Sequence, residues 1–273
     1  MSHSKSNTTF IIFKAYSEEN EPIDPYISIL KNQGYEAHLI PTLEFEYHNF
    51  DILNHKLQNP HDYSGMVITS PRCARGVIKC LADGKLDENW LKKPIFVVGE
   101  TTSRLVNKEL GLEPIGADSG NAMTLIPIIL KYELSKPLLA PCGNLNLNIL
   151  SDNIKTVKFE NIEVYQTIPH NNLKTNLDLL LSQIKNQIGV IFFSPSGFRA
   201  ILDLMPKQLL SQLYLTKELS QLPLKHKLLC DCNIFAIGPT TGAAIKEAGY
   251  ILTGTCEKPK PESMLEMIQS FIK

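Results

Sequence analysis

The chain has 273 residues, 43% of them hydrophobic, which is ample for more than one hydrophobic core. Its 27 Lys and Arg balance 28 Asp and Glu, so no overall field attracts nucleic acid or an anionic membrane, and an anionic ligand must be met locally. No run approaches the roughly 18 apolar residues of a membrane span. The six cysteines form no C-x-x-C pair, and the seven histidines show no metal-ligand spacing. We therefore expect a cytosolic protein with reduced thiols, no metal and no membrane segment.

The front of the chain predicts a strand, a helix and a second strand. Phe10–Phe13 is a short apolar run, Asp24 and Pro25 open a helix that Gly34 ends, and Ala37–Pro41 is a strand closed by its proline. The next segment, Thr42–Tyr47, alternates apolar and polar residues, which predicts a strand with one wet face. Such a strand suits a connector.

From Ser64 onward, strands and helices alternate. The predicted strands cover 66–69, 95–98 and 138–140, and the predicted helices cover 72–81, 103–110, 121–132 and 149–155. Residues 162–168 alternate again, and we expect them to pair with Thr42–Tyr47. Alternating strands and helices of this length specify a parallel sheet with helices on both faces.

The same order then restarts, which indicates an internal duplication. Strands are predicted over 190–193 and 233–237, and helices over 198–205, 242–248 and 261–272. "VITSPRCARGVIKCL" matches "IFFSPSGFRAILDLM", and "IFVVGETTSRLVNKELGL" matches "IFAIGPTTGAAIKEAGYI". The predicted fold is α/β, with two doubly wound, flavodoxin-like parallel-sheet lobes that flank a cleft. We expect lobe 1 over 1–41 and 172–273, lobe 2 over 49–161, and a two-stranded connector from 42–48 and 162–171.

Small polar side chains follow the predicted strands at the helix starts. Backbone N–H groups beside hydroxyls form an anion site, and the carboxyl ends of parallel strands are where open α/β sheets bind ligands. The commonest role of each Ser or Thr alone is to cap its helix. The hydroxyls concerned are Thr69, Ser70, Thr101, Thr102, Ser194, Ser196, Thr240 and Thr241.

Arginine points to the same turns. All four arginines, Arg72, Arg75, Arg104 and Arg199, follow one of them within a few residues, and we expect about half to face the ligand. No G-x-G-x-x-G, P-loop or G-x-S-x-G motif occurs, and no nucleophile is paired with a base. Tyr165 on the connector is the best candidate proton donor, although packing between strands is the commoner role for such a residue.

These motifs together resemble the uroporphyrinogen-III synthase (HemD-like) family, most of all its eukaryotic members. "ITSPR", "VVGETT", "PCGN", "VYQT", "FFSPSG" and "AIGPTT" occur in this order, and the likeness covers nearly the whole chain. Two departures are Asn233, where a basic residue is expected, and 207–232, which we interpret as a surface insertion. The resemblance implies two doubly wound lobes on a two-stranded ladder.

The resemblance also implies the reaction. A cofactor-free cyclising lyase of haem biosynthesis would close hydroxymethylbilane, a linear tetrapyrrole with eight carboxylates, to uroporphyrinogen III with loss of water and inversion of ring D. Tyr165 would assist departure of the hydroxyl. The residues expected to bind substrate are Thr69, Ser70, Arg72, Thr101, Thr102, Gly143, Asn144, Ser194, Ser196, Gly197, Thr240 and Thr241. A monomer is expected, with transient contact to the preceding or following enzyme.

Two other functions fit the same residues. A two-lobed sensor or carrier could clamp a small anion without chemistry, which the lack of a nucleophile favours. A different anionic ligand, such as a phosphorylated metabolite, could use the same architecture. Binding without turnover would indicate the sensor, and competition by phosphate at low concentration would indicate the other ligand.

Overall fold

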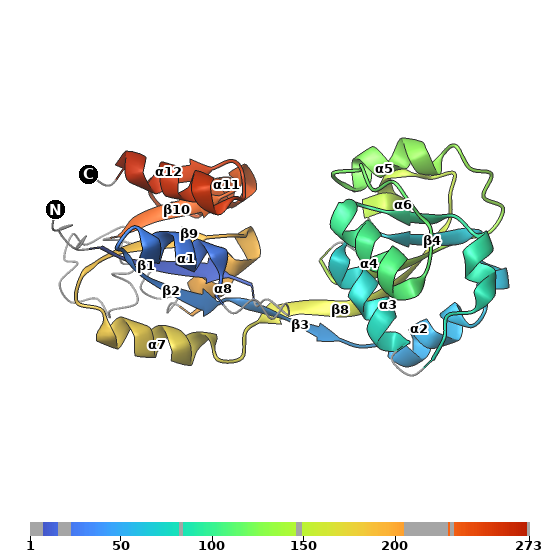
Figure 1. The fold of residues 1–273 in the computed structure, drawn as a ribbon, viewed down its shortest axis with the longest axis horizontal. Coiled ribbons are helices and arrows are strands. Elements are labelled where there is room, and N and C mark those ends of the chain that lie inside the picture. Colours follow the sequence, from blue (N-terminus) through green and yellow to red (C-terminus); the bar gives the residue numbers. More distant parts are fainter. Residues whose placement is uncertain are drawn as a thin grey trace. The chain divides into compact units, whose positions relative to one another are not determined.

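The structure, a computed structural model, describes residues 8–15, 23–81, 84–145, 149–204, 229 and 232–271. The chain forms two compact units, the first from 1–44 with 168–273 and the second from 45–167 (Figure 1). Most of the predicted insertion over 207–232 lies outside the described residues. Among the helices of the described part, none has the length and apolar character needed to span a bilayer.

The first unit is built on a five-stranded sheet in the order β11-β10-β9-β1-β2, with every neighbouring pair parallel. β1 is an interior strand between β9 and β2, where Ile11 is opposite both His38 of β2 and Val190 of β9. The strands are β1 (Thr8–Lys14), β2 (Glu36–Pro41), β9 (Gln187–Phe192), β10 (Asn233–Ile237) and β11 (Gly254–Cys256).

Helices cover both faces of this sheet. Alternate residues of β1 separate two cores: Ile11 and Phe13 pack with one set of helices, and Phe10 and Ile12 with the other. The first set is α7 (Leu173–Gln183), α8 (Pro195–Asp203) and α11 (Pro239–Glu247). The second set is α1 (Pro25–Asn32) and α12 (Pro261–Phe271). A strand buried on both faces requires a continuous apolar run, which explains "FIIF" in β1.

The second unit repeats this plan on a six-stranded sheet in the order β3-β8-β7-β4-β5-β6. The pairs from β8 to β6 are all parallel. The strands are β3 (Leu43–Tyr47), β4 (Gly65–Ile68), β5 (Ile95–Val97), β6 (Pro114–Ile115), β7 (Leu138–Gly143) and β8 (Phe159–Pro169).

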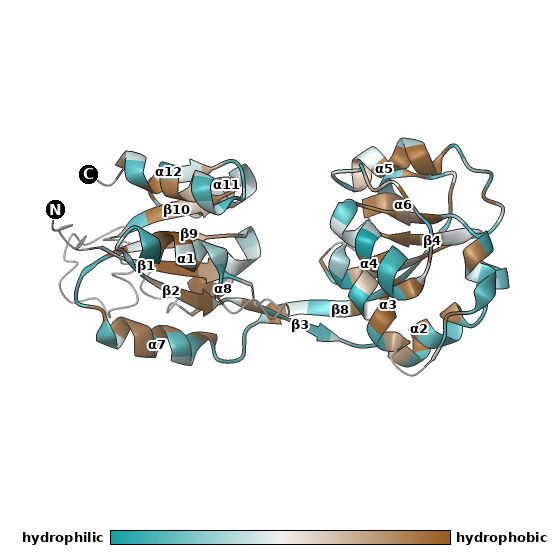
Figure 2. Ribbon diagram, in the orientation of Figure 1, coloured by the Kyte–Doolittle hydropathy of each residue, from teal (hydrophilic) through white to brown (hydrophobic). Residues whose placement is uncertain are grey.

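Two cores again lie on opposite faces of the second sheet. One packs α2 (Phe50–Leu57), α3 (Pro71–Cys80) and α4 (Glu100–Leu110) against Met66 and Ile68. The other packs α5 (Ala122–Ile129) and α6 (Ile149–Asn153) against Val67. Short 3₁₀ helices η1 (Pro60–Asp62) and η2 (Glu88–Lys92) complete the unit. In each unit the hydrophobic strands lie inside and hydrophilic residues line the outer helix surfaces (Figure 2). The predicted doubly wound α/β fold is confirmed.

The duplication is visible in the backbone at the helix starts. Ser70 and Ser194, the N-caps of α3 and α8, have φ/ψ of −155°/158° and −155°/153°. Gly99 and Gly238, the N-caps of α4 and α11, have 81°/153° and 86°/145°. The second pair of conformations is open almost only to glycine, so "VVGETT" and "AIGPTT" need their glycines for the turn itself.

The structure differs from the prediction in several elements. α2 and α7 were not predicted, and η2 replaces the loop expected around Trp90. α4 and α11 begin three residues earlier than predicted, because glycine N-caps place the threonines inside the first helical turn. β8 pairs in parallel with β7 over 159–165 as well as lying beside β3, so the segment predicted as a connector is also a strand of the second sheet.

Candidate functional site

The predicted hydroxyls of both units lie where strands end and helices begin. In the second unit, Thr69 and Ser70 follow β4, while Thr101 and Thr102 lie in the first turn of α4. The first unit carries the related set, with Ser194 and Ser196 after β9 and the pair Thr240 and Thr241 in the first turn of α11. Both units therefore present helix N-termini at the carboxyl edge of a parallel sheet, the usual ligand edge of such folds.

Two of these hydroxyls cap their own helices. The Ser70 Oγ accepts a hydrogen bond from Cys73 N at 3.2 Å, and the Ser194 Oγ accepts one from Gly197 N at 3.0 Å. Proline at the next position of each helix removes one N–H that would need a partner. The capping role expected for such residues is therefore confirmed for these two serines.

A cavity of about 270 Å³ opens at the carboxyl edge of the second sheet. It brings together four predicted site residues, Thr69, Ser70, Gly143 and Tyr165. Its remaining wall comes from Val67, Cys73, Val98, Gly120, Asn121, Ala122, Ala140, Pro141, Cys142, Ile149, Leu150 and Asn161. The other predicted residues of this unit, Arg72, Thr101, Thr102 and Asn144, do not line it.

Tyr165 lies in the wall of this cavity with 8% of its surface exposed. Burial raises the pKa of its phenol above the ordinary value of 10.0, and Cys73 adds to the rise. A hydrogen bond with the Ser70 side chain and the positive charge of Arg72 act in the opposite direction on this pKa. The phenol is therefore protonated at neutral pH and can serve as a proton donor.

In the cavity wall, the Tyr165 ring packs directly against the backbone of Gly143. A β-carbon on Gly143 would lie 2.3 Å from Tyr165 Cζ and 2.6 Å from its hydroxyl oxygen. The register between β7 and β8 also shifts here, since Cys142 is opposite Glu163 but Gly143 is opposite Tyr165. Gly143 therefore makes space for the phenol, which the "PCGN" motif did not reveal.

Two thiols line the same cavity. Burial raises the pKa of Cys73, and it raises that of Cys142 to about 12, with Cys73 and Glu163 adding to the second shift. Both cysteines are therefore protonated thiols at neutral pH, which are poor nucleophiles. Tyr165 thus lies among groups that do not compete with it for a proton.

Asn144 makes hydrogen bonds to the backbone of β8. Its N–H donates to Tyr165 O at 3.2 Å, and its Oδ1 accepts from Thr167 N at 3.0 Å. These bonds hold the residue that follows β7 against β8, at Tyr165 and just beyond it. The prediction that Asn144 binds substrate stays a prediction.

The start of α4 has the properties of an anion site. Gly99 offers no side-chain cap to the helix, so its first N–H groups are open to another acceptor. Two hydroxyl oxygens, Thr102 Oγ1 and Ser119 Oγ, are buried and have no hydrogen-bond partner among the described residues. A buried hydroxyl without a partner costs free energy, so its presence suggests a partner that arrives with a ligand. Ser119 was not predicted, because it lies in an irregular stretch without a motif.

The first unit has an unpartnered hydroxyl of its own. Thr42 Oγ1 is fully buried, has no partner among the described residues, and lies 2.8 Å from where Gly197 would carry a β-carbon. Gly197 therefore lets Thr42 approach the start of α8. Thr42 was predicted only as the first residue of the connector. Asn233, where a basic residue was expected, begins β10 and thus lies at the sheet edge away from the start of α11.

The four arginines differ in exposure and in their influence on Tyr165. Arg72 is exposed on the first turn of α3, Arg104 is exposed on the second turn of α4, Arg75 is half-buried, and Arg199 is exposed on α8. The Arg72 guanidinium lies 3.7 Å from the centroid of the Phe45 ring. Of the four, Arg72 is the one whose charge acts on Tyr165.

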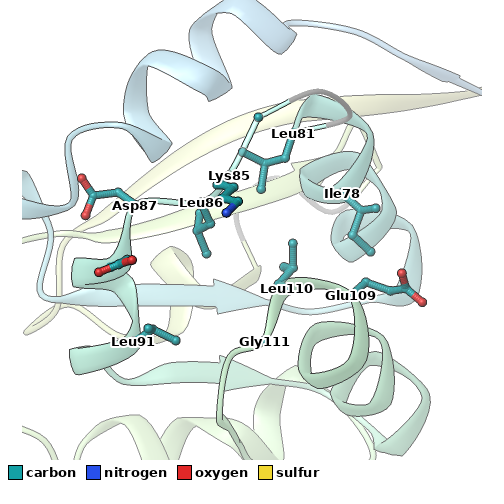
Figure 3. A pocket seen from close by; sticks show the side chains of 11 residues that line it. Ile78, Leu81, Lys85, Leu86, Asp87, Leu91, Glu109, Leu110 and Gly111 are labelled. Atoms are coloured by element: carbon teal, nitrogen blue, oxygen red, sulfur yellow. The ribbon is translucent and has the colours of Figure 1, made fainter.

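A second and larger cavity, of about 440 Å³, lies among the ends of α3 and α4 and the 3₁₀ helix η2 (Figure 3). Leu81, Leu86 and Leu110 form its apolar part, and Asp87 and Glu109 lie at its sides. None of the predicted site residues lines it. Since α3 and α4 contribute their C-termini and Asp87, Glu88 and Glu109 line the cavity, its surroundings disfavour anions, and size alone does not make it the site.

Comparison with known proteins identifies relatives along nearly the whole chain. Residues 24–266 match the family model described as uroporphyrinogen-III synthase HemD. The uroporphyrinogen-III synthase of Schizosaccharomyces pombe is 25% identical over 262 residues, covering 93% of this chain and 94% of that protein. A putative uroporphyrinogen-III synthase of Methanocaldococcus jannaschii is 27% identical over 233 residues, covering 84% and 87%.

Solved structures show the same fold. The uroporphyrinogen-III synthetase of Helicobacter pylori superimposes with a TM-score of 0.59 at 16% identity and covers 96% of this chain and 99% of that one. A mutant uroporphyrinogen III synthase of Thermus thermophilus gives 0.58 at 15% identity, covering 96% and 98%.

Proposed function

Because the chain belongs to the uroporphyrinogen-III synthase family, whose members act on hydroxymethylbilane, we propose that Tyr165 and the cavity around it perform this family's reaction. The chain is a cyclising lyase of haem biosynthesis by family and by its curated relatives. A sensor or carrier without catalysis is not favoured by these matches. The observation that carries the proposal for the site is the protonated Tyr165 phenol in a cavity at the carboxyl edge of the sheet.

The reaction requires loss of a hydroxyl group as water, and a hydroxyl leaves far more readily when it receives a proton. Tyr165 supplies that proton, since its phenol is protonated at neutral pH and lines the cavity. Gly143, which has no side chain, leaves room for the phenol ring in the cavity wall. A positioned acid of this kind contributes roughly 10²–10⁴ to the rate.

The substrate carboxylates need donors, and helix starts provide them without a basic surface. In the second unit we assign this role to the first turn of α4 with Thr101 and Thr102, and to Arg72 on α3. In the first unit the related turns carry Ser196 with Gly197 on α8, and Thr240 with Thr241 on α11. Hydrogen bonds to charged groups contribute about 1.5–3 kcal/mol each, so several turns together can hold an octacarboxylate.

A product assay tests this function. Purified protein is incubated with hydroxymethylbilane generated in situ, and the products are oxidised and separated by isomer. Uroporphyrin III in excess over the spontaneous isomer I is the expected result. Isomer I alone from folded protein would refute the activity and favour the anion-binding sensor.

A further inference from the structure

Arg72 stands in an electrostatically unfavourable place. It is the second residue of α3, and the positive end of a helix dipole repels a cation in the first turn. No acidic residue of that turn compensates it. None of the ion pairs found among the described residues involves Arg72. Within the described part of the chain, a contact other than an ion pair must therefore hold the guanidinium in place.

Phe45 of β3 provides that support. The Arg72 guanidinium carbon lies 3.7 Å from the ring centroid, which is the close approach of a cation stacked on an aromatic face. Stacking uses the face of the guanidinium and leaves its N–H groups at the edge available for a carboxylate. The stack therefore orients Arg72 without occupying its hydrogen-bond donors.

The same ring also contacts Tyr165. The ring centroids of Phe45 and Tyr165 are 6.1 Å apart at an interplanar angle of 76°, an edge-on contact. Phe45 thus lies in contact with both the cation and the proposed proton donor. A carboxylate bound by Arg72 would be held close to the cavity that Tyr165 lines.

We propose that Phe45 is a positioning residue that holds the Arg72 guanidinium ready to bind a substrate carboxylate beside Tyr165. This inference rests on the proposed function and extends it to a residue that the sequence motifs did not indicate. The neighbouring pair on the same two elements supplies a matched control. The Lys79 ammonium lies 4.1 Å from the Tyr47 ring centroid, and Tyr47 is 6.0 Å from Tyr165, but Lys79 lies in the last turn of α3.

The test is a double-mutant cycle with Phe45→Leu, Arg72→Gln and their combination, measured as KM and kcat for hydroxymethylbilane. Loss of the stack is expected to raise KM by roughly 3- to 30-fold with kcat little changed, the size of a cation–π contact. The double variant should then match Arg72→Gln alone. Phe45→Trp, which restores an aromatic face, should recover most of the wild-type KM.

Additive effects in the cycle would overturn the inference, as would an equal rise in KM for Tyr47→Leu, since that ring also touches Tyr165. If Phe45→Leu does not fold, Phe45→Met tests the same contact, because it keeps a flexible apolar side chain and removes the aromatic face. An unchanged KM for Phe45→Met would then refute the stacking role. Wild-type protein that forms no uroporphyrinogen III would refute the proposed function itself, a result distinct from any of these.

Discussion

Replacement of Gly143 by alanine tests whether the exact place of the Tyr165 ring matters. The added methyl group would lie 2.3 Å from Tyr165 Cζ and 2.7 Å from Cε2. Carbon atoms in contact lie about 3.5–4.0 Å apart, so the ring must move by roughly 1–1.5 Å. The backbone cannot give way easily, because β7 lies inside the sheet and Asn144 N is bonded to Tyr165 O.

A shift of this size has two separate consequences. Displacement of a catalytic group by about 1 Å can cost 10²-fold in rate, so kcat should fall by roughly that factor. Overpacking should also lower the free energy of unfolding by about 1–3 kcal/mol. The two effects are separated by measuring isomer III formation under substrate saturation and urea unfolding on the same preparation.

The control is Gly65→Ala at the start of β4. There an added β-carbon would lie 2.4 Å from Pro94 O, but the position is at the other end of the strand from the cavity. A similar loss of stability with kcat nearly unchanged is expected. The reasoning fails if Gly143→Ala keeps kcat within about threefold of wild type, or if Gly65→Ala loses as much kcat.

Three further results are expected. Tyr165→Phe should slow the reaction by roughly 10²–10⁴ while substrate binding persists, and a change under about threefold would remove Tyr165 from the mechanism. Thr102→Val should leave the urea midpoint equal or higher, because the hydroxyl has no partner among the described residues, but should raise KM; a lower midpoint with unchanged KM would contradict a ligand role. Glu160, whose pKa is lowered by its bonds to Lys56 and Tyr63, should contribute stability that is present above its unfolded pKa of about 4.3 and is lost as pH falls through the lower folded pKa. Thermal unfolding between about pH 6 and pH 3 should show this decrease and Glu160→Gln should flatten it, whereas parallel curves would argue against it.

The sequence predicted the alternating strands and helices well, because apolar runs buried on both faces and turns with glycine or Ser-Pro are local signals. It also placed the hydroxyl-bearing turns at helix starts and Tyr165 on a strand. Helix α7 was missed although Leu173, Leu177 and Leu181 have helical spacing, because its start carries no strong signal and Asn172 makes no side-chain cap. The pattern of residues 162–168 indicated one wet face and hid the pairing of β8 with β7.

The parts of the site that could not be predicted depend on distance rather than on residue type. Nothing local in "PCGN" shows that Gly143 must leave room for the ring of Tyr165 on the next strand. Nothing local shows that Phe45 packs against Arg72 either. Ser119 and Thr42 carry common hydroxyls whose meaning comes only from burial without a partner. Such features depend on tertiary contacts between distant residues, and no periodic pattern in the sequence encodes them.

The strand order of the first unit also sets the order in which the chain can fold as it is synthesised. Strand β1 needs β9 as a neighbour, yet the whole of the second unit, 45–167, is made between them. β3 and β8, through which the chain enters and leaves that unit, are adjacent strands, so the folded second unit brings the two ends of the gap together. Each halving of a loop that must close saves about 0.6 kcal/mol. The second unit is a continuous stretch of chain and can therefore fold as it is synthesised. Once folded, it shortens the effective loop between β1 and β9 and so favours their pairing.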